Sequence, residues 1–226
     1  ESESRGLGDV YKRQLFYGFD MIKIWGSKTP RSLRPIWMAE ELEIEYELLP
    51  ISPRSGETLT KEYTNLNPKQ KIPFMEHEDF KLSESLAICK YLQNTFSSNN
   101  LFIPQTAQEL AEEDEWCSFI YGELDETCLY VMRRHYDLTD IYGSAPNVVD
   151  ACREYLKRQF LVIDKYLKNK KHLLDQGFGV ADIFLVSCLD WAVFYEFELP
   201  KNIKMYKEKI SERKAYKKAM EINYQN

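Results

Sequence analysis

The 226-residue sequence has no run that approaches about 18 consecutive apolar residues, the length that a membrane-spanning helix needs. Its longest apolar stretch, residues 184–197, is interrupted by Asp190 and Glu196. The sequence also lacks a dense basic cluster, and its net charge of -6 argues weakly against a nucleic-acid partner. We therefore expect neither a membrane nor a nucleic acid among the partners of this protein.

Histidine and cysteine are scarce, and their arrangement does not suit a metal site. The cysteines are Cys89, Cys117, Cys128, Cys152 and Cys188, and the histidines are His77, His135 and His172. The cysteine count is odd, and no Cys-x-x-Cys pair occurs. We interpret the cysteines as small buried residues in a reducing compartment, in preference to a disulfide framework. Because the histidines have no metal-ligand spacing, we expect no bound metal, and the reducing compartment points to a cytoplasmic location.

The first twenty residues lack the features of a signal peptide. They mix charges with three glycines, and they have neither a basic start nor a long apolar stretch. A clear strand pattern begins only at Met21. We expect residues 1–20 to be a non-native or disordered leader, with the native start at Met21.

The segment of residues 21–96 alternates between strand and helix patterns. Short β-prone runs occupy residues 21–25, 44–49, 74–77 and 80–82, and helical spacing occupies residues 32–43, 60–66 and 83–93. The last two strands are separated by Glu78 and Asp79, as in a hairpin. The order βαβαββα indicates a small α/β domain with a mixed sheet.

The remainder of the chain is purely helical in pattern. Residues 97–105 begin with a polar Ser-Ser-Asn-Asn break and are a predicted linker. Thr106 and Glu109 have the spacing of a capping box at the start of a long helix. Further helices are predicted near residues 148–169, 180–197, 203–208 and 212–222. We therefore expect residues 106–226 to form an all-helical (all-α) domain.

Four motifs, in this order and spacing, resemble the cytosolic glutathione S-transferase family, in its bacterial type with a serine or threonine in the first loop. They are residues 26–42 (GSKTPRSLRPIWMAEEL), 67–73 (NPKQKIP), 82–88 (LSESLAI) and 177–183 (GFGVADI). The resemblance covers nearly all of the chain from Met21 onward. It implies a thioredoxin-like domain over residues 21–96 that binds glutathione, followed by the helical domain. The electrophile would then lie between the two.

The second motif contains the first group of candidate glutathione contacts. In the family the proline that matches Pro73 is cis, and this bond presents the backbone of the preceding residue, here Ile72, to the cysteinyl part of glutathione. An ordinary turn proline is the alternative. Gln70 and Lys71 occupy positions that reach the glycyl carboxylate in related proteins. Both could equally be solvated surface residues.

The third motif places Glu84 and Ser85 at a helix N-terminus directly after a strand. The free N–H groups and the positive dipole end of a helix suit a carboxylate. The resemblance implies that Ser85 holds the γ-glutamyl carboxylate and that Glu84 holds the ammonium group. The alternative is plain helix capping, with Ser83 as the cap and no ligand.

The first loop carries the candidate catalytic hydroxyl. The family activates the glutathione thiol with a hydroxyl, or uses a cysteine, and Thr29 falls on the hydroxyl position while Arg31 falls where some members carry cysteine. Ser27 and Ser32 are rival donors. A helix capped by Ser32 would place Pro35 in its first turn, whereas a cap at Thr29 would require a kink. Simple helix capping by Thr29 or Ser32 is the alternative to catalysis.

The electrophile site would be lined by the first long helix of the second domain, where aromatic side chains could equally belong to the core. The main candidates are Tyr121, Tyr130 and Arg133, and their neighbours Met132, Arg134 and His135 lie close by in the sequence. In the fourth motif, Gly179 takes the place of the family's usual serine or threonine cap. Asp182 can still bond back to the cap region, so this motif concerns folding.

The resemblance implies a glutathione transferase of the detoxification type, which conjugates the glutathione thiolate to a small hydrophobic electrophile. Glutathione would be a co-substrate, and we expect no further cofactor. Because fold alone does not settle the chemistry, a glutathione-dependent lyase, isomerase or dehalogenase is an alternative. A non-catalytic binding or interaction module is another, since Thr29, Gln70 and Gly179 depart from the common family pattern. We also expect a two-fold symmetric homodimer.

Overall fold

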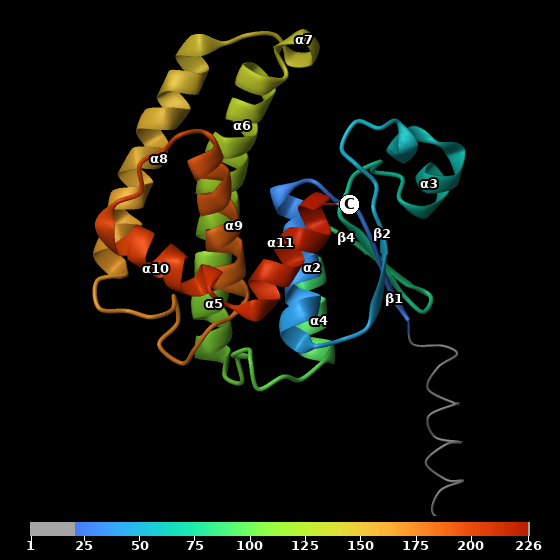
Figure 1. Cartoon of the computed structure of the whole chain (residues 1–226), viewed down its shortest axis with the longest axis horizontal. Coiled ribbons are helices and arrows are strands. Elements are labelled where there is room, and N and C mark those ends of the chain that lie inside the picture. The colour runs from blue at the N-terminus through green and yellow to red at the C-terminus, as the bar shows by residue number, and fades with distance from the viewer. Residues whose placement is uncertain (1–20, 226) are drawn as a thin grey trace, which may run out of the picture.

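The computed structural model describes residues 21–225, so the prediction of a leader over residues 1–20 lies outside the described residues. A half that contains a β-sheet and a half made of helices pack side by side (Figure 1). None of the helices within residues 21–225 combines the length and the apolar character that crossing a membrane requires. The hydrophobic core is continuous from the sheet into the helical half.

The N-terminal half contains a four-stranded mixed sheet. Its strands are β1 (Ile22–Trp25), β2 (Tyr46–Leu49), β3 (Phe74–His77) and β4 (Phe80–Ser83). The spatial order is β2-β1-β3-β4, with β1 parallel to β2 and antiparallel to β3, and with β3 antiparallel to β4. The predicted hairpin between β3 and β4 is confirmed, and Glu78 adopts the left-handed conformation (φ 54°) in its turn.

Three helices complete this half: α2 (Pro30–Leu42), α3 (Lys61–Leu66) and α4 (Ser85–Thr95), with a 3-10 turn η1 (Glu57–Leu59) before α3. The order confirms the predicted βαβαββα pattern and the thioredoxin-like fold that the resemblance implies. Helix α2 is buried along most of its length, because α4, α9 and α11 all contact it. In Figure 1 this helix lies between the sheet and the helical half.

The starts of α2 and α4 differ from the sequence prediction. Helix α2 begins at Pro30, and its cap is Thr29 instead of Ser32. Pro35 therefore lies inside the helix, where it has no N–H to donate to the carbonyl of the preceding turn. Ser83 does not cap α4, because it is the last residue of β4. The N-cap is Glu84, whose φ of 76° is left-handed and whose side chain makes no capping bond.

The C-terminal half is helical throughout its regular structure. Its elements are α5 (Ala107–Phe119), η2 (Ile120–Leu129), α6 (Tyr130–Met132), η3 (Arg133–Asp137), α7 (Thr139–Tyr142), α8 (Pro146–Tyr166), α9 (Val180–Phe194), α10 (Lys201–Ser211) and α11 (Lys214–Gln225). From α5 to η3 the chain is one long helical rod in which η2 and η3 are π-helical. The capping box at its start is confirmed by reciprocal bonds between Thr106 and Glu109.

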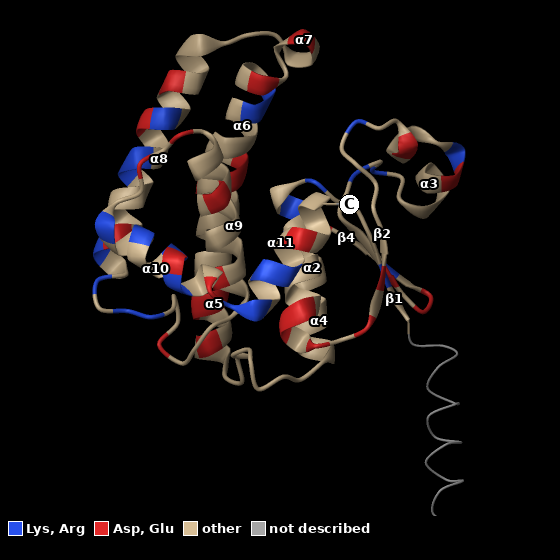
Figure 2. Cartoon of the chain, viewed as in Figure 1, with Lys and Arg blue, Asp and Glu red and all other residues tan. Residues whose placement is uncertain are grey.

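Buried polar groups support this half. Asp182 accepts hydrogen bonds from the backbone N–H groups of Gly179 (2.9 Å) and Leu173 (2.9 Å) and from the hydroxyl of Tyr206 (2.5 Å). The capping role that the sequence predicts for Asp182 is thus confirmed. All five cysteines are free and buried. Acidic and basic residues are interspersed along α8, whereas α10 carries four lysines and a single glutamate (Figure 2).

Candidate functional site

The first loop and the loop before β3 meet at Gly26. This residue has a φ of 118°, in the region that favours glycine, and a Cβ atom here would lie 2.8 Å from Ile72 Cβ and 2.8 Å from Ser32 Oγ. Any larger residue would push the two loops apart. Glycine thus permits the close approach of the motif that carries Thr29 to the motif that carries Pro73.

The bond between Ile72 and Pro73 is cis, as the resemblance implies. Pro73 is buried and Ile72 is half-buried beside the first loop. The carbonyl of Lys71 accepts bonds from the hydroxyl of Tyr63 (2.7 Å) and from the side-chain amide of Asn67 (2.9 Å), while the Lys71 side chain is exposed. These bonds fix the backbone of the loop directly before the cis bond and leave the lysine ammonium group at the surface.

Two more candidate residues already have partners on the surface. Gln70 adopts a φ of 54°, and its amide donates a hydrogen bond to Thr64 Oγ1 at 3.0 Å. The Glu84 carboxylate pairs with Lys69 Nζ at 2.9 Å, and both side chains are more than half exposed. This ion pair joins the loop before β3 to the start of α4. Exposed ion pairs contribute little stability, so the Glu84 carboxylate can exchange its partner readily.

Ser85 is the first residue of α4 and is almost fully buried. Its Oγ accepts a hydrogen bond of 3.3 Å from Nη1 of Arg34, which comes from α2. The free N–H groups of the first turn of α4 lie at the same place. This end of the helix therefore combines a hydroxyl, backbone donors and a nearby guanidinium group, all of which suit a carboxylate ligand.

Thr29 and Ser32 form a compact pair at the start of α2. The Thr29 hydroxyl accepts a bond from the backbone N–H of Ser32 and donates one to Ser32 Oγ, both at 2.9 Å. Ser32 is fully buried, whereas Thr29 keeps 5% of its surface exposed. Of the two candidate residues, only Thr29 retains any exposed surface. Ser27, the third rival, is fully buried and bonds weakly to the carbonyl of Ile51 (3.5 Å).

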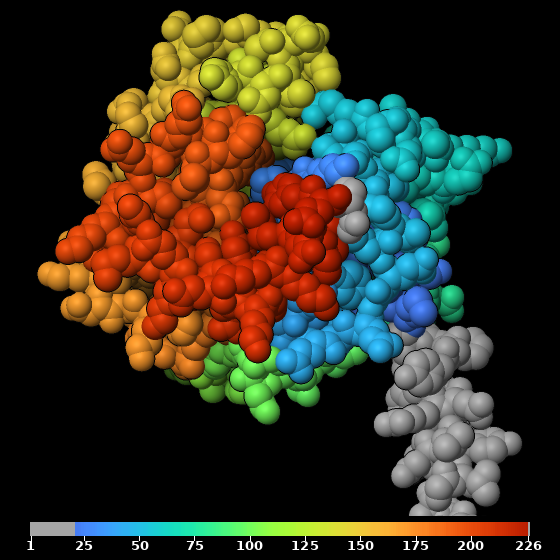
Figure 3. All heavy atoms as spheres, in the orientation of Figure 1, coloured from blue at the N-terminus to red at the C-terminus, as the bar shows by residue number. Residues whose placement is uncertain are grey.

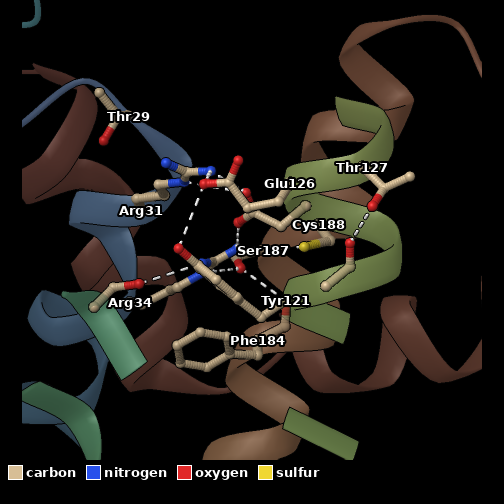
Figure 4. A network of polar contacts seen from close by, with 12 residues as sticks. Thr29, Arg31, Arg34, Tyr121, Glu126, Thr127, Phe184, Ser187 and Cys188 are labelled. Carbon is tan, nitrogen blue, oxygen red and sulfur yellow. Dashed lines mark hydrogen bonds and ion pairs between the residues drawn. The ribbon is translucent and has the colours of Figure 1, made fainter. Parts of the chain in front are cut away.

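A buried charge network joins α2 to the long helix of the other half (Figure 4). Asp125 of η2 accepts bonds from Nη2 of Arg31 at 2.5 Å and from Nη2 of Arg34 at 2.5 Å. Arg34 and Asp125 both have fully buried side chains. Arg31 also pairs with Glu126 at 2.9 Å. Burial alone would raise the pKa of Asp125, but the two arginines outweigh it and hold that pKa below its usual value.

The contacts of Arg34 extend this network into α9. Its Nε donates to Ser187 Oγ (2.8 Å), its Nη2 approaches Cys188 Sγ (3.3 Å), and its guanidinium carbon lies 4.3 Å from the centre of the Phe184 ring. Burial raises the pKa of Cys188 to about 12 despite the nearby guanidinium of Arg34, so this thiol stays protonated. Figure 4 shows Arg34 extending from α2 toward these residues.

This network was not predicted from the sequence. Arg31 was noted only as the residue at a family cysteine position, and neither Arg34 nor Asp125 was a candidate. A signal was present, because Asp125 lies between Leu124 and Cys128 on the apolar side of the predicted helix. A carboxylate that interrupts such a face needs a buried cationic partner.

Two of the predicted electrophile-site residues lie against the first motif. The guanidinium carbon of Arg31 is 5.9 Å from the centre of the Tyr121 ring and 4.2 Å from that of Tyr130. Burial raises the pKa of Tyr121, with Arg31 opposing, and Glu84 is among the charges that act on it. The two tyrosines therefore bring the helical half against Arg31 of the first motif.

Arg133 lies one turn further along the rod, at the start of η3. Its side chain is partly buried, and among residues 21–225 it forms no ion pair within 4 Å. Burial lowers its pKa, and the positive charge of Arg54, in the loop after β2, lowers it further. Arg134 stacks on the Tyr130 ring at 4.5 Å. The part of the candidate site near Arg133 and Arg134 is thus positively charged.

A separate cavity lies away from these residues. It measures about 490 Å³ and is enclosed mainly by α5, the end of α8 and the following loop, with Trp116, Phe119 and Tyr166 among its lining residues. None of the predicted site residues lines it. Within residues 21–225, no group of three or more His, Cys, Asp or Glu side chains is arranged to hold a metal ion.

Comparison with known families agrees with this geometry. Residues 21–94 match the family described as "Glutathione S-transferase, N-terminal domain", and residues 124–220 match "Glutathione S-transferase, C-terminal domain". Glutathione S-transferase theta-1 of Bos taurus is 27% identical over 152 residues, which cover 66% of this chain. The match spans 63% of the length of that relative.

Solved structures share the fold over most of their length. A glutathione transferase from Phanerochaete chrysosporium, solved with oxidized glutathione, has a TM-score of 0.79 at 21% identity, with 91% of this chain and 97% of that chain covered. The beta-etherase LigF from Sphingobium sp. strain SYK-6 has a TM-score of 0.78 at 18% identity, with 89% and 99% covered. At such identities the likeness concerns the fold alone.

Proposed function

Because the chain belongs to the glutathione S-transferase family, we propose that it binds glutathione and transfers its thiolate to a small hydrophobic electrophile. The observation that carries the proposal is the convergence of three motifs. The Thr29 hydroxyl, the cis Ile72–Pro73 bond and the Ser85 end of α4 come together through Gly26 and Arg34. Each of the three motifs would contact a different part of the glutathione tripeptide.

Each charged group of glutathione is matched by protein groups of opposite polarity. Ser85 and the N–H groups of α4 hold the γ-glutamyl carboxylate, and Glu84 leaves Lys69 to pair with the ammonium group. Gln70 and Lys71 take the glycyl carboxylate. The backbone of Ile72, before the cis bond to Pro73, pairs with the cysteinyl residue.

The thiol is activated by Thr29. On binding, its hydroxyl exchanges the bond to Ser32 Oγ for a bond to the glutathione sulfur, and Ser32 keeps its backbone bond to Thr29 Oγ1. A donor that stabilises the thiolate lowers the pKa of the thiol, and the positive end of the α2 dipole acts in the same direction. The thiol proton passes to solvent.

The electrophile lies between Tyr121, Tyr130 and Arg133. The thiolate sulfur forms a bond to the electrophilic carbon, and the leaving group departs with the electrons of the broken bond. The two tyrosine rings supply apolar contact area, and Arg133 offers an unpaired positive charge for a leaving group or substituent that carries negative charge.

The same activated thiolate could serve a glutathione-dependent lyase, isomerase or dehalogenase. The beta-etherase neighbour supports this second proposal at the level of fold. A non-catalytic module would keep glutathione binding without turnover. We also propose a homodimer, which light scattering tests, and a domain division at residues 97–105, which limited proteolysis tests. We further propose a cytoplasmic location.

Two assays test the proposed function. Turnover of a panel of aryl halides, epoxides and β-aryl ethers with glutathione separates transferase from lyase chemistry and both from a binder. Thr29→Ala should lower the rate at neutral pH and lower it least at high pH, where the thiol ionises without help. Ser27→Ala is the matched control and should retain full rate. Loss of rate in Ser27→Ala with none in Thr29→Ala would refute the assignment of Thr29.

A further inference from the structure

The first loop is held from the other end of the chain. Asn223, in the last turn of α11, is fully buried and donates a bond from Nδ2 to the carbonyl of Thr29 at 3.1 Å. Its own backbone carbonyl accepts the N–H of Lys28 at 2.9 Å. Figure 3 shows this C-terminal segment, in red, lying against the N-terminal half. One residue of α11 thus bonds to two consecutive residues of the loop.

These contacts differ in kind from the other bonds of Thr29. Its hydroxyl bonds to Ser32, and its carbonyl accepts the N–H of Leu33 at 3.0 Å, so both interactions stay within the first turn of α2. Within residues 21–225, only Asn223 ties Thr29 to a distant part of the sequence. The local bonds make Thr29 the N-cap of α2, and the bond from Asn223 fixes the position of the Thr29 backbone.

The loop needs such a support, because Lys28 has a left-handed backbone with φ 57°. Few residues other than glycine adopt this region, and they keep it only where surrounding structure imposes it. The N–H of Lys28 is directed to the carbonyl of Asn223 by this conformation. Asn223 thus supports Lys28 through its main chain, which a side-chain substitution keeps, and supports Thr29 through its side chain.

The Asn223 side chain is not an optimal choice for stability alone. Its Oδ1 is buried without a hydrogen-bond partner among the described residues, and a buried unpaired acceptor is unfavourable. A leucine of similar volume would remove that penalty. The amide is therefore explained by what its Nδ2 does at Thr29.

We propose that Asn223 is a positioning residue, which aims the Thr29 hydroxyl at the glutathione sulfur by holding the Thr29 carbonyl. The inference rests on the proposed function, since it assigns Asn223 to the same reaction. Asn223 touches neither substrate. Its effect passes through the backbone of Thr29, which sets the direction of the Thr29 side chain.

The test compares Asn223→Leu with Tyr216→Phe. Tyr216 lies on the same helix and bonds to Asp190 (3.0 and 3.2 Å) but makes no contact with the first loop, so Tyr216→Phe loosens α11 without removing the support. The pKa of the bound thiol is read from the ultraviolet absorbance of the thiolate, and glutathione affinity from calorimetry. Amide exchange at Ser32, whose N–H bonds to the Thr29 hydroxyl, reports on the position of Thr29 with or without ligand.

Asn223→Leu should raise the pKa of the bound thiol by about half to one unit, which lowers turnover roughly three- to tenfold below that pKa and restores it at high pH. Glutathione affinity should change less than about threefold, and the Ser32 amide should exchange faster. Tyr216→Phe should leave the thiol pKa unchanged. Asn223→Ala, which removes the same donor, replaces Asn223→Leu if the leucine variant does not fold.

An unchanged thiol pKa in Asn223→Leu, or an equal shift in Tyr216→Phe, would overturn the positioning role. A wild-type protein that does not bind glutathione overturns the proposed function instead. In that case unchanged amide exchange at Ser32 in Asn223→Leu would additionally show that the Asn223 side chain does not hold the loop.

Discussion

Replacing Asp125 by asparagine should destabilise the protein strongly. Asp125 is the common partner of Arg31 and Arg34, and the Arg34 side chain is fully buried. Asparagine keeps the shape and one acceptor but removes the charge, so Arg34 is left in the core with its positive charge uncompensated. Breaking a buried pair in this way costs about 3–5 kcal/mol of unfolding free energy. The bonds of Arg34 to Ser187 and Ser85 place the expected loss toward the lower end.

The assay is equilibrium unfolding in urea at neutral pH, with Glu126→Gln as the matched control. Glu126 pairs with the same Arg31 but has 40% of its side chain exposed, so its removal should cost about 1 kcal/mol or less. Asp125→Leu combined with Arg34→Met removes both charges and should recover most of the stability. A loss below about 1 kcal/mol for Asp125→Asn would refute the reasoning, because the network would then be energetically equivalent to a surface pair.

The pH dependence of the free energy of unfolding tests the direction of the shift in the Asp125 pKa. The folded-state pKa of Asp125 lies below the ordinary 3.8, because Arg34 and Arg31 outweigh the effect of burial. The stability that it contributes is therefore fully present above that ordinary value and is lost as the pH falls through the lower folded-state pKa. The difference between wild type and Asp125→Asn should stay constant from neutral pH to about pH 5 and shrink only in stronger acid.

Two further predictions follow from the described contacts. Ser85→Ala should weaken glutathione binding roughly ten- to a hundredfold in calorimetry. Ser83→Ala, at the end of β4, should leave the affinity unchanged. Equal losses of affinity in the two variants would show that Ser85 does not belong to the site. Burial raises the pKa of Asp182 from 3.8 to about 6, so stability relative to Asp182→Asn should increase by about 3 kcal/mol as the pH falls from above 6 to below 4. A pH-independent difference in urea unfolding would contradict that shift.

Much of the fold could be predicted from the sequence because its signals are local. The hairpin between β3 and β4, the capping box of Thr106 and Glu109, and the capping by Asp182 depend on neighbours within a few residues. The predicted start of α2 at Ser32 was wrong because Thr29 and Ser32 are both good caps, and the helix begins at Pro30 after Thr29. Pro35 favoured the later start, yet tertiary contacts around α2 tolerate a proline inside the helix.

The support of the candidate site could not be predicted in the same way. The ion pair of Arg34 with Asp125 joins residues that are 91 positions apart in the sequence. The hydrogen bond from Asn223 to Thr29 joins residues that are 194 positions apart. Neither pair has a spacing that a local pattern reveals, because only the packing of the helical half on α2 brings the partners together. The motifs thus indicated the candidate ligand contacts, and the long-range contacts show what holds those residues in place.

The central proposal is that the chain binds glutathione and ionises its thiol at Thr29. Calorimetric titration of the whole chain with glutathione, repeated in two buffers of different ionisation enthalpy, measures affinity and proton release together. The proposal predicts saturable binding with release of part of one proton near neutral pH, and less release in Thr29→Ala at similar affinity. Absence of saturable binding, or binding that releases no proton in the wild type, would contradict it.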